Sequence, residues 1–235
     1  MREGLGEKKR RAQKVFRELR KTYSGAKIAL RYGNSVQLLV AVILSAQCTD
    51  KKVNEVTVTL FKKYRTVDHF ADANLKIFEQ EIRSTGFYRA KARHIISAAK
   101  ILRRDFGGKL PKTIDEMRRL PGVARKTANV VLGNAYGIVE GVAVDTHVRR
   151  LAQRLGFSKQ SDPEKIERDL MALFPKFQWF PLTYTLIEHG RTICKAPAPR
   201  CEICPVAPLC PTGTKRLGGV ASVKRAAQRK REAVE

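Results

Sequence analysis

The sequence predicts an all-α protein, and three observations lead to that expectation. Apolar residues recur at helical spacing along most of the 235 residues. Strand-like alternation of apolar and polar residues is hard to find. Capping residues and glycines stand where these helical stretches would begin and end. Wholesale disorder is excluded, because 43% hydrophobic and 29% charged residues is ordinary globular composition.

The expected helices follow one another along the chain. A basic amphipathic helix contains residues 15–19 and closes near residues 23–25. Asn34 and Ser35 are suitable N-caps for an apolar helix that runs through Leu44. Thr49-Asp50 opens the next helix, and a later one with an apolar face over residues 95–106 ends at Gly107-Gly108.

The charge predicts a polyanionic partner. The formal net charge is +25, of which +14 lies between Thr22 and Cys210, in the body of the chain. Nucleic acid is the first partner this indicates, an anionic membrane surface the second, and a basic surface that only aids solubility the plain alternative. Residues 212–235 and the first one or two turns of the chain are expected to be disordered basic extensions.

A membrane location is disfavoured by two observations. The longest apolar run, Leu38–Leu44, is far shorter than the roughly 20 residues that a spanning helix needs. The N-terminus has basic residues but no apolar segment of the kind found in secretory signals. The expected location is the cytoplasm, in association with the nucleoid, and no membrane partner is expected.

Four of the five cysteines form a compact cluster with the spacing C-x6-C-x2-C-x5-C: Cys194, Cys201, Cys204 and Cys210. Four thiolates in a short loop rich in proline can hold a zinc ion or an iron–sulfur cluster. Zinc sites usually pair two short knuckles, whereas here only the central pair is a knuckle. The longer arms favour a [4Fe–4S] cluster over zinc and over four unpaired core cysteines. Cys48 lies outside this set and is expected to be a small core residue.

A Pro-Gly turn between two helical stretches predicts a phosphate-binding hairpin. In LPGVARKTANVVLG, which begins at Leu120, the helix after Gly122 starts near Ala124. The backbone N–H groups and the positive dipole end at such a helix start form an anion site. This is the logic of a helix–hairpin–helix, which binds the DNA backbone irrespective of sequence.

Lys126 and Asp145 each allow two interpretations. Lys126 is either a phosphate contact or a nucleophile, since the dipole end and Arg125 disfavour its ammonium form. Asp145, in VAVDTHVRRLAQRLG, stands at a helix start and by itself is most simply an N-cap.

These motifs together resemble the endonuclease III family. LSAQCTD, LPGVARKTANVVLG, VAVDTHVRRLAQRLG and the cysteine cluster occur in that order and spacing. The resemblance runs from about Val15 to Cys210 and implies a DNA glycosylase and abasic-site lyase of base excision repair. It implies a six-helix barrel with the hairpin at residues 28–138 and an iron–sulfur domain at residues 1–27 and 139–211, with a DNA-binding cleft between them and a tail at residues 212–235.

The resemblance also implies roles for individual residues. Lys126 would attack C1′ of an extruded nucleotide to give a Schiff base, and Asp145 would be the catalytic aspartate. Gln47 and Phe87 match the two positions that fill the gap left in the duplex; otherwise Gln47 is an ordinary helix-end residue and Phe87 a core aromatic. The remaining DNA contacts implied lie in the hairpin and the cysteine loop: Gly122, Ala124, Arg125, Thr127, Lys195 and Arg200.

Two departures from the family pattern stand out. Ala124 replaces the usual second hairpin glycine, which is harmless only if that position keeps a negative φ. The loop between Cys194 and Cys201 is less basic than usual, with only Lys195 and Arg200.

Duplex DNA with oxidised pyrimidines or abasic sites is the expected partner, and the protein is expected to be a monomer. Three alternatives remain. One is a mismatch-specific adenine glycosylase of the same superfamily, which would carry glutamate at Ala41 and lack the hairpin lysine. The others are a non-catalytic helix–hairpin–helix module and a ferredoxin-like electron carrier, against which the charge of +25 argues.

Overall fold

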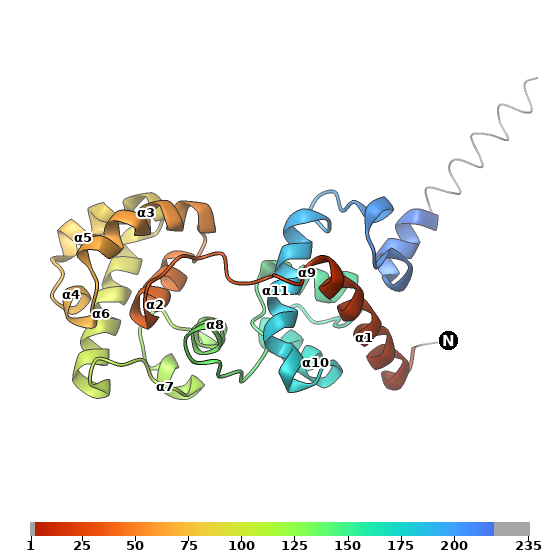
Figure 1. Ribbon diagram of the computed structural model, residues 1–235, viewed down its shortest axis with the longest axis horizontal. Helices are drawn as coiled ribbons and strands as arrows, with labels where there is room; N and C mark the ends of the chain where they lie inside the picture. The colour runs from red at the N-terminus through yellow and green to blue at the C-terminus, as the bar shows by residue number, and fades with distance from the viewer. Residues whose placement is uncertain (1–2, 219–235) are drawn as a thin grey trace, which may run out of the picture. The chain divides into compact units, whose positions relative to one another are not determined.

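The computed structural model describes residues 3–218, and over that range the chain is built from helices, turns and loops without a strand (Figure 1). The predicted all-α class is confirmed. The chain divides into two compact units, which are described separately. One unit is the continuous segment Ile28–Glu140, and the other combines the segment that ends at Lys27 with the segment that begins at Gly141.

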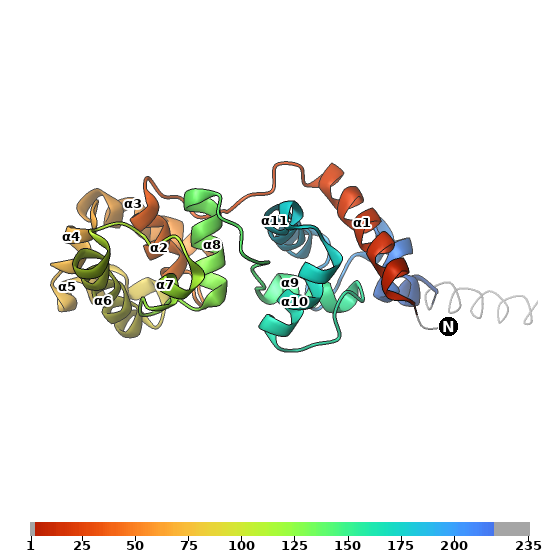
Figure 2. The same ribbon diagram turned by 90° about the horizontal axis from the view of Figure 1, so that it is seen from below.

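The unit of residues 28–140 is arranged around one apolar helix. Its elements are α2 (Ser35–Leu44), α3 (Asp50–Lys63), α4 (Val67–Ala71), α5 (Leu75–Glu81), the short 3₁₀ helix η1 (Arg83–Thr85), α6 (Tyr88–Phe106), α7 (Ile114–Arg118) and α8 (Arg125–Tyr136). Every residue of α2 after Ser35 is buried, as expected of a helix that is apolar all round. In Figures 1 and 2, α2 lies beside α8, and α7 lies beside α8 on another side.

The predicted helix ends in this unit are confirmed. Asn34 caps α2 by accepting a hydrogen bond from the Gln37 backbone N–H. Thr49 does the same for α3, which begins at Asp50. Gly107 ends α6 in the left-handed region at φ +56°, where glycine pays no Cβ penalty. These ends fix the lengths of the helices that carry the loops of the candidate site.

The second unit brings the N-terminal helix onto the C-terminal half of the chain. Its elements are α1 (Leu5–Thr22), α9 (Thr146–Arg154), α10 (Pro163–Leu173), α11 (Lys176–Thr192) and the 3₁₀ helices η2 (Cys201–Ile203) and η3 (Ala207–Leu209). The amphipathic pattern of α1 buries Ala12, Val15, Phe16 and Leu19 in this unit's core. There α1 packs on α10 and α11, and the ring of Phe16 meets that of Phe174 edge-on at 6.0 Å.

Two segments that were expected to be disordered, the first turns of the chain and residues 212–218, contain helices. The first turns were expected to be disordered, but α1 begins at Leu5. Arg11 explains the difference, because its Nη1 donates to the backbone oxygens of Leu155 at 2.7 Å and Leu209 at 3.1 Å. The expected disorder is also wrong for residues 212–218, which are helical, with the Thr212 hydroxyl donating to the Arg154 carbonyl at 2.9 Å. The rest of the predicted tail, residues 219–235, lies outside the described residues.

Within residues 3–218, none of the helices combines the length and the apolar character needed to cross a membrane.

Candidate active site and metal centre

The predicted hairpin is formed by α7, α8 and the turn between them. Gly122 sits in this turn at φ +80°, a conformation that other residues rarely adopt. A Cβ built there would lie 3.1 Å from Cβ and Nδ1 of His94, a residue of α6. Glycine is therefore required at this position both by the backbone conformation and by the close approach of α6.

Ala124 occupies the N-cap position of α8 with φ −83° and ψ 170°. This is extended backbone that any L-residue adopts, so replacing the usual glycine causes no strain. The alanine side chain also makes no capping hydrogen bond to the first turn of α8. Helix N-termini without a side-chain cap present N–H groups to solvent or to an anion.

Lys126 lies in the first turn of α8, two residues after the Ala124 N-cap. Its side chain is exposed, whereas its neighbours Arg125 and Thr127 are half-buried. The helix thus holds the backbone of Lys126 firmly and leaves its amine accessible, next to the hairpin turn.

Asp145 is the N-cap of α9, as its sequence context predicted. Its Oδ1 accepts a 2.8 Å hydrogen bond from the Val148 backbone N–H, and the side chain is half-buried. Burial lowers the pKa of the nearby His147, and the Asp145 carboxylate opposes that shift. The cap orients the carboxylate, since one oxygen is committed to the helix.

Gln47 and Phe87 share an uncommon backbone conformation. Among the described residues they are the two non-glycine positions with positive φ, at +51° and +48°. Both are exposed, and 66% of the Phe87 surface is accessible. The alternative that Phe87 is a core aromatic is therefore wrong. A left-handed non-glycine residue costs on the order of 1–3 kcal/mol, and such residues cluster at functional sites.

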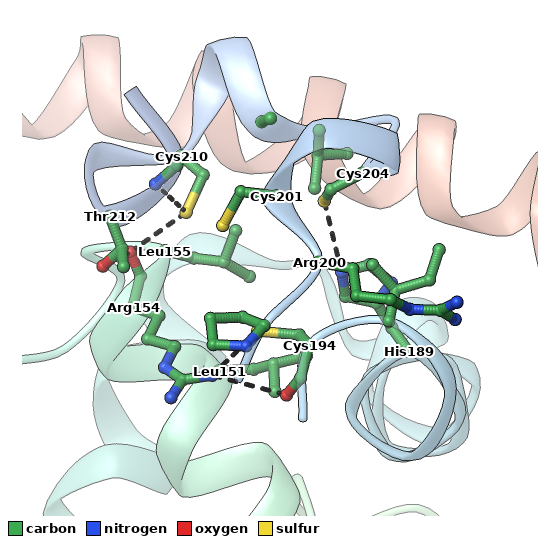
Figure 3. A pocket seen from close by; sticks show the side chains of 15 residues that line it. Leu151, Arg154, Leu155, His189, Cys194, Arg200, Cys201, Cys204, Cys210 and Thr212 are labelled. Atoms are coloured by element: carbon green, nitrogen blue, oxygen red, sulfur yellow. Dashed lines mark hydrogen bonds between the residues drawn. The ribbon is translucent and has the colours of Figure 1, made fainter. Parts of the chain in front are cut away.

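The four clustered cysteines line one cavity in the second unit (Figure 3). The cavity volume is about 20 Å³, and its walls include Leu151, Leu155, Ile193 and Val206. In Figure 3 the side chains of Cys194, Cys201, Cys204 and Cys210 stand around this space.

The four thiols around this cavity have the chemistry to ligate a metal cofactor. In the part of the chain that the structure describes, no three His, Cys, Asp or Glu side chains converge closely enough to hold a single metal ion. Burial raises the pKa of the Cys204 thiol to about 11 and also raises that of Cys210. Thiols that resist ionisation in this way need a bound cation to become thiolates. Four such groups around a shared space are suited to ligate a metal cofactor through thiolates.

Two residues that no sequence motif singles out, Arg154 and His189, contact the cysteine sulfurs. Arg154 Nη1 lies 3.3 Å from Cys194 Sγ, and the same guanidinium donates to the backbone oxygens of Lys195 and Ala196. His189 Nε2 lies 3.5 Å from Cys204 Sγ. His189 is buried and its other nitrogen, Nδ1, pairs with the Tyr23 hydroxyl at 3.2 Å. The LIEHG context of His189 carries no metal-ligand spacing that would have drawn attention to it.

The candidate DNA contacts of the cysteine loop are both exposed. Lys195 contributes its carbonyl to the Arg154 contact, which leaves its own ammonium at the surface. Arg200 Nη2 donates to the Thr192 carbonyl at 2.9 Å and so also helps to close the loop.

The predicted residues fall into two groups, one in each unit. The unit of residues 28–140 carries Gln47, Phe87 and the hairpin positions from Gly122 to Thr127. The other unit carries Asp145 and the cysteine loop with Lys195 and Arg200.

Comparison with known proteins shows which protein superfamily the chain belongs to. Residues 40–176 match the HhH-GPD superfamily of base excision DNA repair proteins. That match spans more than half of the chain, and the chain therefore belongs to this superfamily.

Individual relatives narrow the class. Endonuclease III of Synechocystis sp. is 49% identical over 208 residues, which cover 88% of this chain and 95% of that protein. Endonuclease III of Bacillus subtilis is 46% identical over 192 residues, 81% of this chain and 87% of that protein. A solved structure of a trapped covalent endonuclease III–DNA intermediate has a TM-score of 0.85 at 43% identity and covers 89% of this chain and 98% of that one. Within the superfamily the chain belongs to the endonuclease III family, and the protein is a DNA glycosylase and abasic-site lyase of base excision repair.

Proposed function

We propose that the protein excises oxidised pyrimidines of the thymine glycol type from duplex DNA through a Schiff base at Lys126, and then cuts the strand by β-elimination. The observation that carries this proposal is the exposed amine of Lys126 in the first turn of α8, directly after the hairpin turn. The trapped covalent DNA intermediate solved for an endonuclease III of 43% identity supports the same chemistry.

Lys126 supplies the nucleophile. Its neutral amine attacks C1′ of the extruded nucleotide, the C1′–N bond breaks, and the damaged base leaves with a proton. The sugar ring opens to give an iminium between Lys126 and C1′. Loss of a C2′ proton then expels the 3′ phosphate, and hydrolysis of the imine releases the amine.

Asp145 acts as an electrostatic group on the sugar of the extruded nucleotide. The sugar becomes cationic as the glycosidic bond breaks, and a fixed carboxylate stabilises that charge without reorganising. The cap to Val148 limits the rotation of Asp145.

The hairpin binds the DNA backbone. The uncapped N-terminus of α8, with Gly122, Ala124, Arg125 and Thr127 around it, is a site for a phosphate of the damaged strand. Lys195 and Arg200 add phosphate contacts from the cysteine loop. The net charge of +25 supports salt-dependent binding to the duplex by a monomer, and with it association with the nucleoid.

Gln47 and Phe87 fill the gap that extrusion leaves. Extruding a nucleotide costs a few kcal/mol of lost stacking and pairing. An exposed aromatic ring and an exposed amide, each on a strained left-handed residue, are suited to replace that stacking and pairing.

A [4Fe–4S] cluster would be held by Cys194, Cys201, Cys204 and Cys210. When bound, it supplies iron–thiolate bonds that cross-link the 194–210 loop and a redox-active centre. Arg154 and His189 would orient two of the ligands through their contacts with Cys194 and Cys204. The cavity shared by the four thiols supports this assignment.

The domain assignment follows the same family. A six-helix barrel with the hairpin would span residues 28–138, and an iron–sulfur domain would combine residues 1–27 with 139–211. The division of the chain after Lys27 and after Glu140 supports these limits.

Lys126→Gln tests the proposal. It should abolish both the borohydride-trapped DNA adduct and strand cleavage, because the substituted side chain has no nucleophilic amine. Binding to abasic DNA should survive, since the hairpin N–H groups remain. Lys109→Gln, which neutralises another exposed lysine of the same unit, is the matched control. Trapping by Lys126→Gln at the wild-type level would show that another amine is the nucleophile and would leave Lys126 as a phosphate contact.

A further inference from the structure

Helix α6 contains a lysine in an unusual place. Lys91 is 5% exposed, although lysine is almost never buried unless its charge is compensated. Burial lowers the pKa of its ammonium group. A lysine retained against this cost needs a structural reason that an apolar side chain of similar length would not provide.

The two hydrogen bonds of Lys91 join separate segments. Its Nζ donates to the Leu44 carbonyl and to the Thr85 carbonyl, each at 2.8 Å. Leu44 is the last residue of α2 and Thr85 is the last residue of η1. C-terminal carbonyls of helices lack intrahelical donors, and a cation there is favourable. Lys91 thus provides a hydrogen-bond donor to the C-terminal carbonyls of two helices, which lie 41 positions apart in the sequence.

Each of these carbonyls stands just before a candidate gap-filling residue. Gln47 is three positions after Leu44, and Phe87 is two positions after Thr85. Local bonds hold each turn separately: the Ser45 hydroxyl donates to Val42, and the Thr85 hydroxyl donates to Ile82. Lys91 differs from these local bonds, because it connects one turn to the other.

We propose that Lys91 is a positioning residue that fixes the Gln47 and Phe87 loops relative to each other, so that both side chains enter the duplex together. This inference rests on the gap-filling roles of Gln47 and Phe87 in the proposed function. The ammonium does not touch DNA in this role. It sets the spacing of two backbone segments whose left-handed residues then aim the side chains.

The test compares two substrates with Lys91→Met. Methionine preserves most of the length and volume of lysine but donates no hydrogen bond. A thymine glycol duplex requires gap filling, whereas an abasic site in a single strand has no stacked partner to replace. Lys100→Met, at an exposed position of the same helix, is the control. Single-turnover rates are measured for base excision in the duplex and for β-elimination in the single strand.

The inference predicts a selective loss. Lys91→Met should slow duplex excision roughly ten- to a hundredfold, the scale expected of small misplacements near a reacting group. Its single-strand rate should stay within about twofold of wild type, because no gap-filling group is needed there. Equal loss on both substrates would mean that Lys91 only stabilises the fold, and no loss on either would also overturn the inference.

Double substitution separates this inference from the proposed function and does not require the Lys91 variant to fold. If Gln47→Ala and Phe87→Ala each leave duplex excision unchanged, the gap-filling roles themselves are wrong. If each slows excision and the rate effects of the pair multiply independently, the roles stand but the loops are not coupled and the inference fails. A double variant much less impaired than the product of the single effects is the expected result.

Discussion

Asp145 combines a structural contact with a proposed chemical role, and substitution can separate the two. Its Oδ1 caps α9 through the 2.8 Å bond from Val148 N–H. Asn keeps an equivalent oxygen, so Asp145→Asn should leave the free energy of unfolding within about 0.5 kcal/mol of wild type. Ala removes the cap, so Asp145→Ala should lower it by about 1 kcal/mol.

The two variants should differ in stability but lose excision activity to the same extent. Both variants lose the carboxylate charge, so both should slow thymine glycol excision by about 10²–10³-fold, the loss typical of removing one preorganised electrostatic group. Single-turnover excision and denaturant unfolding, measured on the same preparations, give the two quantities.

Asp162 provides the matched control in the same unit. It caps α10 in the same way, with Oδ1 accepting from Lys165 N–H at 2.9 Å, and it is exposed. Asp162→Asn and Asp162→Ala should reproduce the stability pattern without the loss of activity. If Asp145→Asn excised thymine glycol at the wild-type rate, Asp145 would be a helix cap and nothing more.

Two further predictions concern the hairpin and the cysteine cavity. Gly122→Ala should destabilise the protein by roughly 1–3 kcal/mol and weaken binding to abasic duplex, because φ +80° and the 3.1 Å approach to His94 both oppose a Cβ. Gly137→Ala, at φ +67° with open space around it, is the control and should lower the free energy of unfolding by less and leave DNA binding unchanged. Equal effects of the two substitutions would contradict the argument. His189→Phe should speed the loss of iron to a chelator, because Cys204 Sγ loses its imidazole contact; an unchanged rate would show that His189 does not support the cluster.

Much of the architecture could be predicted because it depends on local patterns. The cap at Asn34, the apolar run of α2 and the glycine at 107 are short-range signals, and each element forms where those signals lie. Asp145 was expected to be an N-cap from the apolar face that follows it, and it is one. The sequence could not show whether alanine at position 124 strains the hairpin, and the negative φ of Ala124 shows that it does not.

The rest depended on contacts between distant residues. Nothing next to Arg11 indicates that its guanidinium reaches the carbonyls of Leu155 and Leu209 and so orders the N-terminus. Phe87 is exposed and has a left-handed backbone, and neither property could be predicted from an aromatic residue at this position. No local sequence signal indicates that the ammonium of Lys91 is buried against two helix ends.

The central claim is that Lys126 forms the covalent bond to DNA. The direct measurement is borohydride trapping of the wild-type protein on an abasic duplex, followed by proteolysis and mass spectrometry of the DNA-linked peptide. The account predicts one modified residue, Lys126, in the peptide that follows the hairpin. A trapped adduct located on any other lysine or on the N-terminal amine would contradict it.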